Sequence, residues 1–147
     1  ERLADAFLRN EHALQLITDC EFEVPAIGMI QGYPFRGKAD VLGKGIVDLK
    51  TTSDLKAFPY SARKFSYMCQ VYIYCELFSM DWKDFKFIAV DKGSLDIGIY
   101  DVSEEFYNLG KDKTMRAIET YEAFFINGAD LDTYCIKGIL WKQKNNF

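Results

Sequence analysis

The stretch from Arg36 to Ser53 reads RGKADVLGKGIVDLKTTS, and the fold of the chain can be worked outward from it. It predicts two short strands joined by a tight turn, because Gly43 and Gly45 supply the backbone freedom that short hairpin loops need. With a turn at residues 43–45, Asp40 lies opposite Asp48 on the neighbouring strand. Strand alternation then places Asp48 and Lys50 on one face.

Two carboxylates and one ammonium group therefore share a small patch. Directly opposed residues have Cβ atoms roughly 5 Å apart, and like charges at that distance are destabilising unless something lies between them. A divalent cation such as Mg²⁺, which prefers carboxylate oxygens and keeps several waters, resolves the repulsion. Lys50 could then steer a water molecule or offset charge on a phosphate. The alternative is a surface hairpin with a loose ion pair.

Three motifs in this region resemble those of a known superfamily. Residues 37–40 read GKAD, residues 48–52 read DLKTT and residues 70–74 read QVYIY. In this order they resemble the G-x-x-D, (D/E)-x-K and Q-x-x-x-Y motifs of the PD-(D/E)xK nucleases, in the RecB/RecE-like branch. The Lys-Thr-Thr tail is similar to that of exodeoxyribonuclease VIII-type and phage recombination exonucleases. The resemblance covers about residues 20 to 80.

The resemblance implies a reaction and a set of site residues. It implies an Mg²⁺-dependent DNA exonuclease, acting in phage-type recombination or DNA repair, with Mn²⁺ as the alternative ion. Asp40, Asp48 and the backbone carbonyl of Leu49 would hold the metal. Lys50 would position the nucleophile or stabilise the transition state. DNA is then the partner, and a homo-oligomer and a single-strand annealing protein are further expected partners.

Two other functions stay open from the sequence. One is a structure-specific or restriction-type endonuclease on the same core, which would nick a closed circular DNA that an exonuclease leaves intact. The other is a catalytically inactive DNA-binding module. The presence of Asp40, Asp48 and Lys50 together argues against the inactive module.

The segment after the hairpin predicts a long helix over residues 60–79. Gln70 and Tyr74 are four residues apart and share a face of this helix. In the resembling nucleases this pair contacts the DNA backbone or orients the catalytic lysine. Core packing is an equal alternative for Tyr74. The amide of Gln70, which lies among apolar residues, needs hydrogen-bond partners if it is buried.

The remaining elements predict the fold class. A helix over residues 3–17 precedes strands at 20–31, 35–41 and 45–51, which form an antiparallel meander. Strands at 84–91 and 95–102 follow the long helix, and a last helix runs from residue 103 to about 127. This order predicts an α/β domain with a central mixed β-sheet flanked by helices, which is the PD-(D/E)xK restriction-endonuclease-like core.

In the resembling family, the helix ahead of the hairpin often carries a side chain that reaches the metal, and Glu11 or His12 could fill that place. His12 is the only histidine of the chain, which excludes a zinc site with two histidines. A Ser-His-Asp triad is open only through His12, and no Gly-x-Ser-x-Gly motif accompanies it.

Composition predicts a single nuclease domain over residues 1–147, a length that supports a sizeable core. The chain begins with Glu1, so an upstream segment is expected to be missing. No apolar run approaches the roughly 20 residues of a membrane span, and no secretory signal is visible, so we expect a cytoplasmic protein without membrane contact. The four cysteines form no Cys-x-x-Cys pair, which predicts free thiols and no iron–sulfur cluster.

Charge is distributed unevenly along the chain. The net charge is −4, which excludes a protein that binds nucleic acid over its whole surface. Residues 36–64 nevertheless carry seven basic and three acidic side chains, so this segment has a net positive charge. A local basic strip beside two carboxylates suits a phosphate backbone that must be held and cut.

Overall fold

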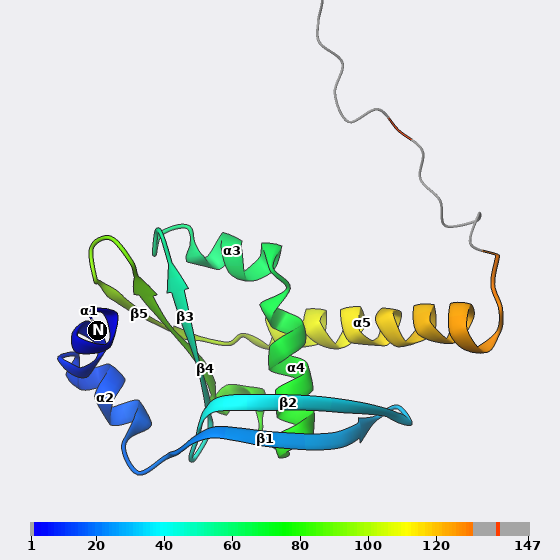
Figure 1. Cartoon of the computed structure of the whole chain (residues 1–147), viewed down its shortest axis with the longest axis horizontal. Coiled ribbons are helices and arrows are strands. Elements are labelled where there is room, and N and C mark those ends of the chain that lie inside the picture. Colours follow the sequence, from blue (N-terminus) through cyan, green and yellow to red (C-terminus); the bar gives the residue numbers. More distant parts are fainter. Residues whose placement is uncertain (1, 131–137, 139–147) are drawn as a thin grey trace, which may run out of the picture. The chain divides into compact units, whose positions relative to one another are not determined.

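The computed structural model describes residues 2–130 and 138, and its centre is a mixed β-sheet. Five strands lie in the order β1-β2-β3-β4-β5, in which β3 and β4 are parallel and the other neighbours are antiparallel (Figure 1). The strands are β1 (Glu21–Ile30), β2 (Tyr33–Leu42), β3 (Ile46–Thr52), β4 (Phe85–Asp91) and β5 (Ile97–Asp101). The predicted α/β class and the antiparallel meander are confirmed.

Helices cover both faces of the sheet, and each face has its own apolar cluster. One cluster packs around Phe7 of α1, Ala13 of α2 and Val47 of β3. The other packs around Phe58 of α3 and Val71 of α4 against the opposite face. The helices are α1 (Arg2–Leu8), α2 (Glu11–Ile17), α3 (Phe58–Lys64), α4 (Tyr67–Phe78) and α5 (Glu104–Tyr121), with a 3₁₀ turn, η1 (Trp82–Asp84), and a π turn, η2 (Glu122–Ile126).

Both of the first two predicted helices are broken in the structure. The predicted helix over 3–17 is α1 and α2, because the Asn10 side chain accepts a hydrogen bond from Ala13 N at 2.9 Å and begins a second helix. The predicted helix over 60–79 is α3 and α4. Ser66 between them has a left-handed backbone with φ of 57°, which a continuous α-helix cannot contain.

The register between β2 and β3 is the predicted one, but the pairing is short. Val41 pairs with Val47 and Leu42 pairs with Ile46, and the ladder stops before Asp40. Ala39 belongs to the cluster under α4 and Val41 to the cluster under α2, although strict alternation would place them on one face. The strand β2 therefore turns at Asp40, and the β1–β2 hairpin diverges from β3 at that residue.

The chain divides into two compact units, Glu1–Met115 and Arg116–Phe147, and the whole sheet belongs to the first. The thiols of Cys20, Cys69 and Cys75 are free, whereas Cys135 lies outside the described residues. Within residues 2–130, none of the helices combines the length and the hydropathy of a membrane-spanning segment.

Candidate active site at the divergence of β2 and β3

Asp48 is the most deeply buried charged residue of the described chain, with 1% of its surface exposed. It lies on β3 on the face that packs against α4. Its Oδ1 accepts a hydrogen bond from Gln70 Nε2 of α4. Its Oδ2 lies 2.7 Å from Lys50 Nζ as an ion pair that lacks hydrogen-bond geometry. Lys50 Nζ donates instead to Gln70 Oε1 at 3.0 Å, so the three side chains close a triangle.

Burial raises the pKa of Asp48, because the ionised carboxylate loses its water. The ammonium group of Lys50 acts in the opposite direction and lowers the pKa of Asp48, as does the hydrogen bond from Gln70. The nearby charge of Asp40 raises it again. The site therefore holds a carboxylate in a place that disfavours its charge, with one ammonium group and one amide as compensation.

Asp40 lies where β2 leaves β3, and it bridges the gap between the two strands. Its Oδ2 accepts a hydrogen bond from the backbone N–H of Leu49 at 2.8 Å. The Leu49 side chain is 40% exposed, so its peptide group is the part of this residue that adjoins Asp40. The two carboxylates that the sequence placed opposite each other are thus neighbours, although the strand pairing has ended before Asp40.

Tyr74 is placed beside β2 and away from the triangle. Its hydroxyl oxygen accepts a hydrogen bond from the backbone N–H of Lys38 at 3.4 Å. Its ring packs where a Cβ on Gly37 would lie 2.7 Å from Tyr74 Cε1. This tyrosine therefore supports the strand that carries Asp40, and among the described residues it makes no hydrogen bond to Asp48 or Lys50.

Comparison with known protein families identifies the family to which this chain belongs. A family described as a PDDEXK-like domain of unknown function (DUF3799) matches residues 4–137. The chain belongs to this family. The resemblance to the PD-(D/E)xK superfamily that the three motifs carried is thereby confirmed.

A solved structure shares the fold of this DUF3799 chain. A protein from Eubacterium rectale named "putative exonuclease" superimposes with a TM-score of 0.69 at 16% sequence identity. The match covers 96% of this chain and 60% of that one, so this chain spans about three fifths of its neighbour. A second structure, named SSO0001, has a TM-score of 0.44 and 19% identity over 76% of this chain and 58% of that one. No curated protein matches the chain.

The carboxylates fit the divalent ion that PDDEXK-like nucleases generally use. Asp40 and Asp48 are close enough for the charge of one to raise the pKa of the other, and a bound cation would relieve that repulsion. Within residues 2–130, no cluster of three histidine, cysteine or carboxylate side chains accompanies them. Glu11 and His12, exposed at the start of α2, are therefore not brought to the pair. Two carboxylates suit Mg²⁺, which keeps several waters, better than structural zinc.

Tyr67, the residue that covers Lys50, was not among the predicted site residues. The Lys50 ammonium group lies 4.6 Å from the centroid of the Tyr67 ring, a cation–π distance. A signal was available, because Tyr67, Gln70 and Tyr74 follow one another at the three- and four-residue spacing of one helix face. The ring limits the freedom of the lysine and shields it from water on one side.

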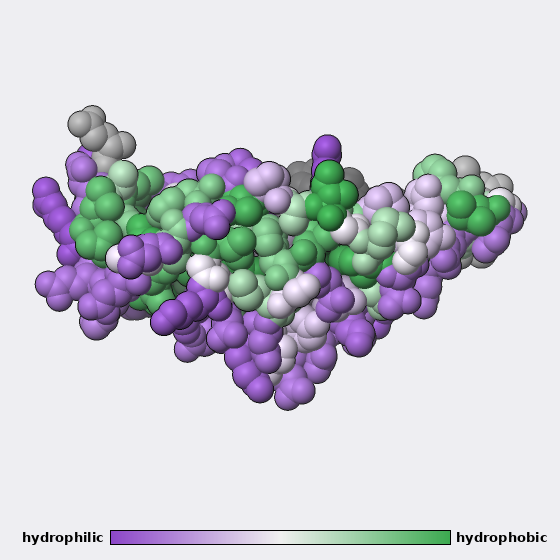
Figure 2. Space-filling view, turned by 90° about the horizontal axis from the view of Figure 1, so that it is seen from below, coloured by the Kyte–Doolittle hydropathy of each residue, from purple (hydrophilic) through white to green (hydrophobic). Residues whose placement is uncertain are grey.

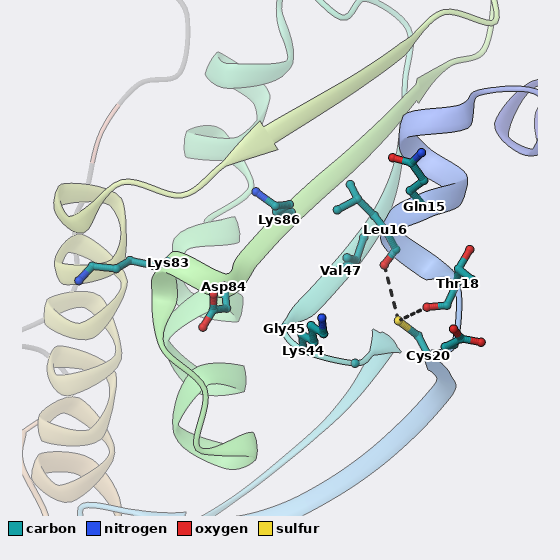
Figure 3. A pocket seen from close by; sticks show the side chains of 12 residues that line it. Gln15, Leu16, Thr18, Cys20, Lys44, Gly45, Val47, Lys83, Asp84 and Lys86 are labelled. Atoms are coloured by element: carbon teal, nitrogen blue, oxygen red, sulfur yellow. Dashed lines mark hydrogen bonds between the residues drawn. The ribbon is translucent and has the colours of Figure 1, made fainter.

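A hollow of about 600 Å³ opens at the other end of β3, on the α2 side of the sheet (Figure 3). It is lined by Leu16 of α2, by Lys44 of the β2–β3 turn and by Lys86 of β4. The Cys20 thiol at its edge donates to the backbone oxygens of Leu16 and Thr18. None of the predicted site residues lines it, so this hollow is separate from the Asp48–Lys50 pair.

Proposed function

We propose that this chain is a metal-dependent deoxyribonuclease that hydrolyses phosphodiester bonds. One observation carries the proposal: Asp48 is buried with an amide on one oxygen and an ammonium group on the other, beside a second carboxylate, Asp40. A buried charge of this kind is unfavourable for stability, and such groups gather at functional sites. Asp40, Asp48 and the carbonyl of Leu49 would hold Mg²⁺, with Mn²⁺ as the alternative.

The bound ion would supply positive charge at the scissile phosphate and acidify a water molecule. Lys50 would stabilise the charge that develops on the phosphate or position the attacking water. Gln70 acts as a positioning residue, because its amide holds Lys50 and Asp48 at the same time. Tyr74 would support the site indirectly, by holding β2 in the place where Asp40 meets Leu49.

The β1–β2 hairpin offers a surface for the DNA backbone. Arg36 and Lys38 are exposed and alternate with residues that face α4, so they lie on the outer face of the hairpin that ends at Asp40. Ile27 and Met29 on β1 are 82% and 66% exposed on the same face. Figure 2 views the chain from the side on which the hairpin lies and shows apolar residues among hydrophilic ones there. Basic side chains with apolar neighbours suit a sugar–phosphate backbone.

We propose exonuclease activity in particular, supported by the motif resemblance and by the name of the Eubacterium rectale neighbour. The test is cleavage of end-labelled linear duplex and of covalently closed circular DNA, each with Mg²⁺ and with EDTA. Mg²⁺-dependent loss of the linear DNA alone is the expected result. Nicking of the circle would establish the endonuclease alternative, and binding without cleavage of either DNA would establish an inactive module.

Four further proposals concern the extent of the domain, its location in the cell, its biological role and its partners. We propose one nuclease domain over residues 1–147, a cytoplasmic location, and a role in phage-type recombination or DNA repair. A second copy of the chain and a single-strand annealing protein are the proposed partners. Size-exclusion chromatography with light scattering measures the first of these, and co-purification with a defined annealing protein measures the second.

A further inference from the structure

Phe65 is an apolar side chain that the fold leaves in solvent beside the candidate active site. It follows α3, and the left-handed Ser66 separates it from α4. Its ring is 60% exposed, yet it is not isolated. The ring centroid lies 6.1 Å from that of Tyr67, at an interplanar angle of 30°. The helix break therefore leaves the Phe65 ring largely exposed while it stays in contact with Tyr67.

Tyr67 links this exposed ring to the catalytic lysine and to the core. Its ring stacks on Phe87 of β4 with centroids 5.9 Å apart and lies 6.2 Å from Phe58 of α3. Lys50 Nζ lies 4.6 Å from the same ring. A continuous row of aromatic contacts thus runs from the buried Phe87 through Tyr67 to the surface. Because its inner members are packed, the outer ring has a rigid support close to Lys50.

Two lysines lie near the exposed ring, Lys64 over the ring itself and Lys113 at the neighbouring Ser66. Lys64 Nζ lies 5.6 Å from the Phe65 ring centroid, and Lys113 of α5 donates from Nζ to Ser66 Oγ at 3.2 Å. Within residues 2–130 the ion pairs are those of Lys38, Lys50 and Lys86. The charges of Lys64 and Lys113 are therefore not neutralised by a described carboxylate. Exposed aromatic rings combined with nearby cations bind single-stranded nucleic acid, by base stacking and phosphate attraction.

We propose that Phe65 stacks an unpaired base of the substrate strand, with Lys64 and Lys113 attracting the phosphates beside it. The site would therefore favour DNA whose end is single-stranded or frayed over fully paired duplex. The inference rests on the proposed function for one point, that the phosphate near this base is the one cut at Lys50. The stacking itself needs no metal and no cleavage.

The test measures binding in EDTA, where no cleavage occurs. The probe is a short single-stranded DNA oligonucleotide with one 2-aminopurine, a base whose fluorescence falls when it stacks on an aromatic ring. The wild-type chain should quench the probe and bind it. Phe65→Ala should weaken binding by about 5- to 150-fold, the range of one base stack. Phe65→Trp should retain quenching, and Phe65→Leu, which keeps an apolar side chain without a π face, should lose it.

Tyr60→Ala is the matched control. Tyr60 is 70% exposed on α3, it precedes Phe65 in the same basic segment, and it makes no ring contact with another described residue. Its removal should leave oligonucleotide binding unchanged. Equal binding by Phe65→Ala and wild type, or an equal loss in Tyr60→Ala, would overturn the proposal. So would a change of oligomeric state in Phe65→Ala at unchanged affinity, because the ring would then serve a protein contact.

The two proposals fail in different ways. If the wild-type chain binds and quenches the probe but cuts no DNA in Mg²⁺, the proposed function fails and the stacking site stands. If it cuts linear DNA and Phe65→Ala binds the probe normally, the stacking site fails and the proposed function stands. Urea unfolding of each variant verifies that the differences in binding do not come from loss of the fold.

Discussion

Replacing Gln70 by leucine probes how the buried carboxylate is kept ionised. The substitution keeps a side chain of similar length but removes both the donor to Asp48 Oδ1 and the acceptor of Lys50 Nζ. Asp48 is 1% exposed, so water cannot replace the lost donor. Lys50 retains 20% exposure of its side chain and can turn to solvent. The main loss is therefore the bond to the carboxylate.

The expected loss of stability in Gln70→Leu follows from the hydrogen bond between Gln70 and Asp48. A hydrogen bond to a charged group contributes about 1.5–3 kcal/mol. The free energy of unfolding of Gln70→Leu, measured by urea at neutral pH, should fall by about this amount. Gln15→Leu is the matched control, because Gln15 lies exposed in α2 without a hydrogen bond from its amide to a described residue. The free energy of unfolding of Gln15→Leu should stay within about 0.5 kcal/mol of the wild-type value.

The stability difference between wild type and Gln70→Leu should depend on pH in one direction only. The hydrogen bond from Gln70 lowers the pKa of Asp48 against the larger effect of burial, which raises it. Without the amide, the pKa of Asp48 rises further. The stability difference between wild type and Gln70→Leu is therefore fully present above the variant's Asp48 pKa. It shrinks as the pH falls from the variant's pKa to the wild-type pKa, because a protonated carboxyl needs the donor less.

Activity provides the second readout. The acid limb of kcat/KM should move to higher pH in Gln70→Leu, because the carboxylate that we propose as a metal ligand forms at higher pH. An unchanged acid limb together with unchanged stability would refute the assignment of Gln70 as the residue that positions Asp48 and Lys50. A loss of stability without a shift of the acid limb would leave Gln70 a purely structural role.

Three further predictions concern the surroundings of the site. Gly37→Ala should destabilise the fold by about 1–3 kcal/mol, because the new Cβ would meet Tyr74 Cε1 at 2.7 Å, and Tyr74→Leu should relieve the loss in a double-mutant urea experiment. Arg36→Ala should reduce the slope of log K against log salt for DNA binding by about 1, whereas an unchanged slope would remove the hairpin from the interface. Burial raises the pKa of the Cys75 thiol to about 12, so iodoacetamide at neutral pH should label Cys75 only after unfolding, as mass spectrometry would show.

Strand alternation made the central hairpin predictable. The Gly43–Gly45 turn fixed the pairing of Val41 with Val47, and the same alternation placed Asp48 and Lys50 on one face. These features follow from a period of two and a short loop, both of which can be counted in the sequence. The triangle with Gln70 was predictable in part, because an amide among apolar residues had to find partners.

The turn of β2 at Asp40 was not predictable in the same way. Two features accompany it, the packing of Tyr74 of α4 against Gly37 and the left-handed backbone of Glu23 on β1. The first is a contact between segments distant in sequence, which no local pattern encodes. The consequence is functional, because the bend puts the Asp40 carboxylate on the peptide N–H of Leu49 and not in a regular ladder position.

The break between α3 and α4 was missed for a local reason. Ser66 adopts a left-handed backbone although it is neither glycine nor asparagine, so composition gave no sign of a helix end. Tertiary contacts hold it there, including the hydrogen bond from Lys113. The break matters for the site because it sends Phe65 to the surface and starts α4 at Tyr67, the ring that covers Lys50.

The most direct test of the central claim is the cleavage rate of Asp40→Asn on linear duplex DNA in Mg²⁺. Asparagine can still accept the Leu49 N–H bond, so the fold should be kept while the metal-binding charge is lost. Asp54→Asn is the matched control, because the exposed Asp54 also accepts a backbone N–H, from Lys56 at 2.8 Å, away from the triangle. Asp40→Asn should unfold at the wild-type urea midpoint but cleave no faster than wild type in EDTA, whereas Asp54→Asn should cleave normally. Wild-type cleavage by Asp40→Asn would contradict the central claim.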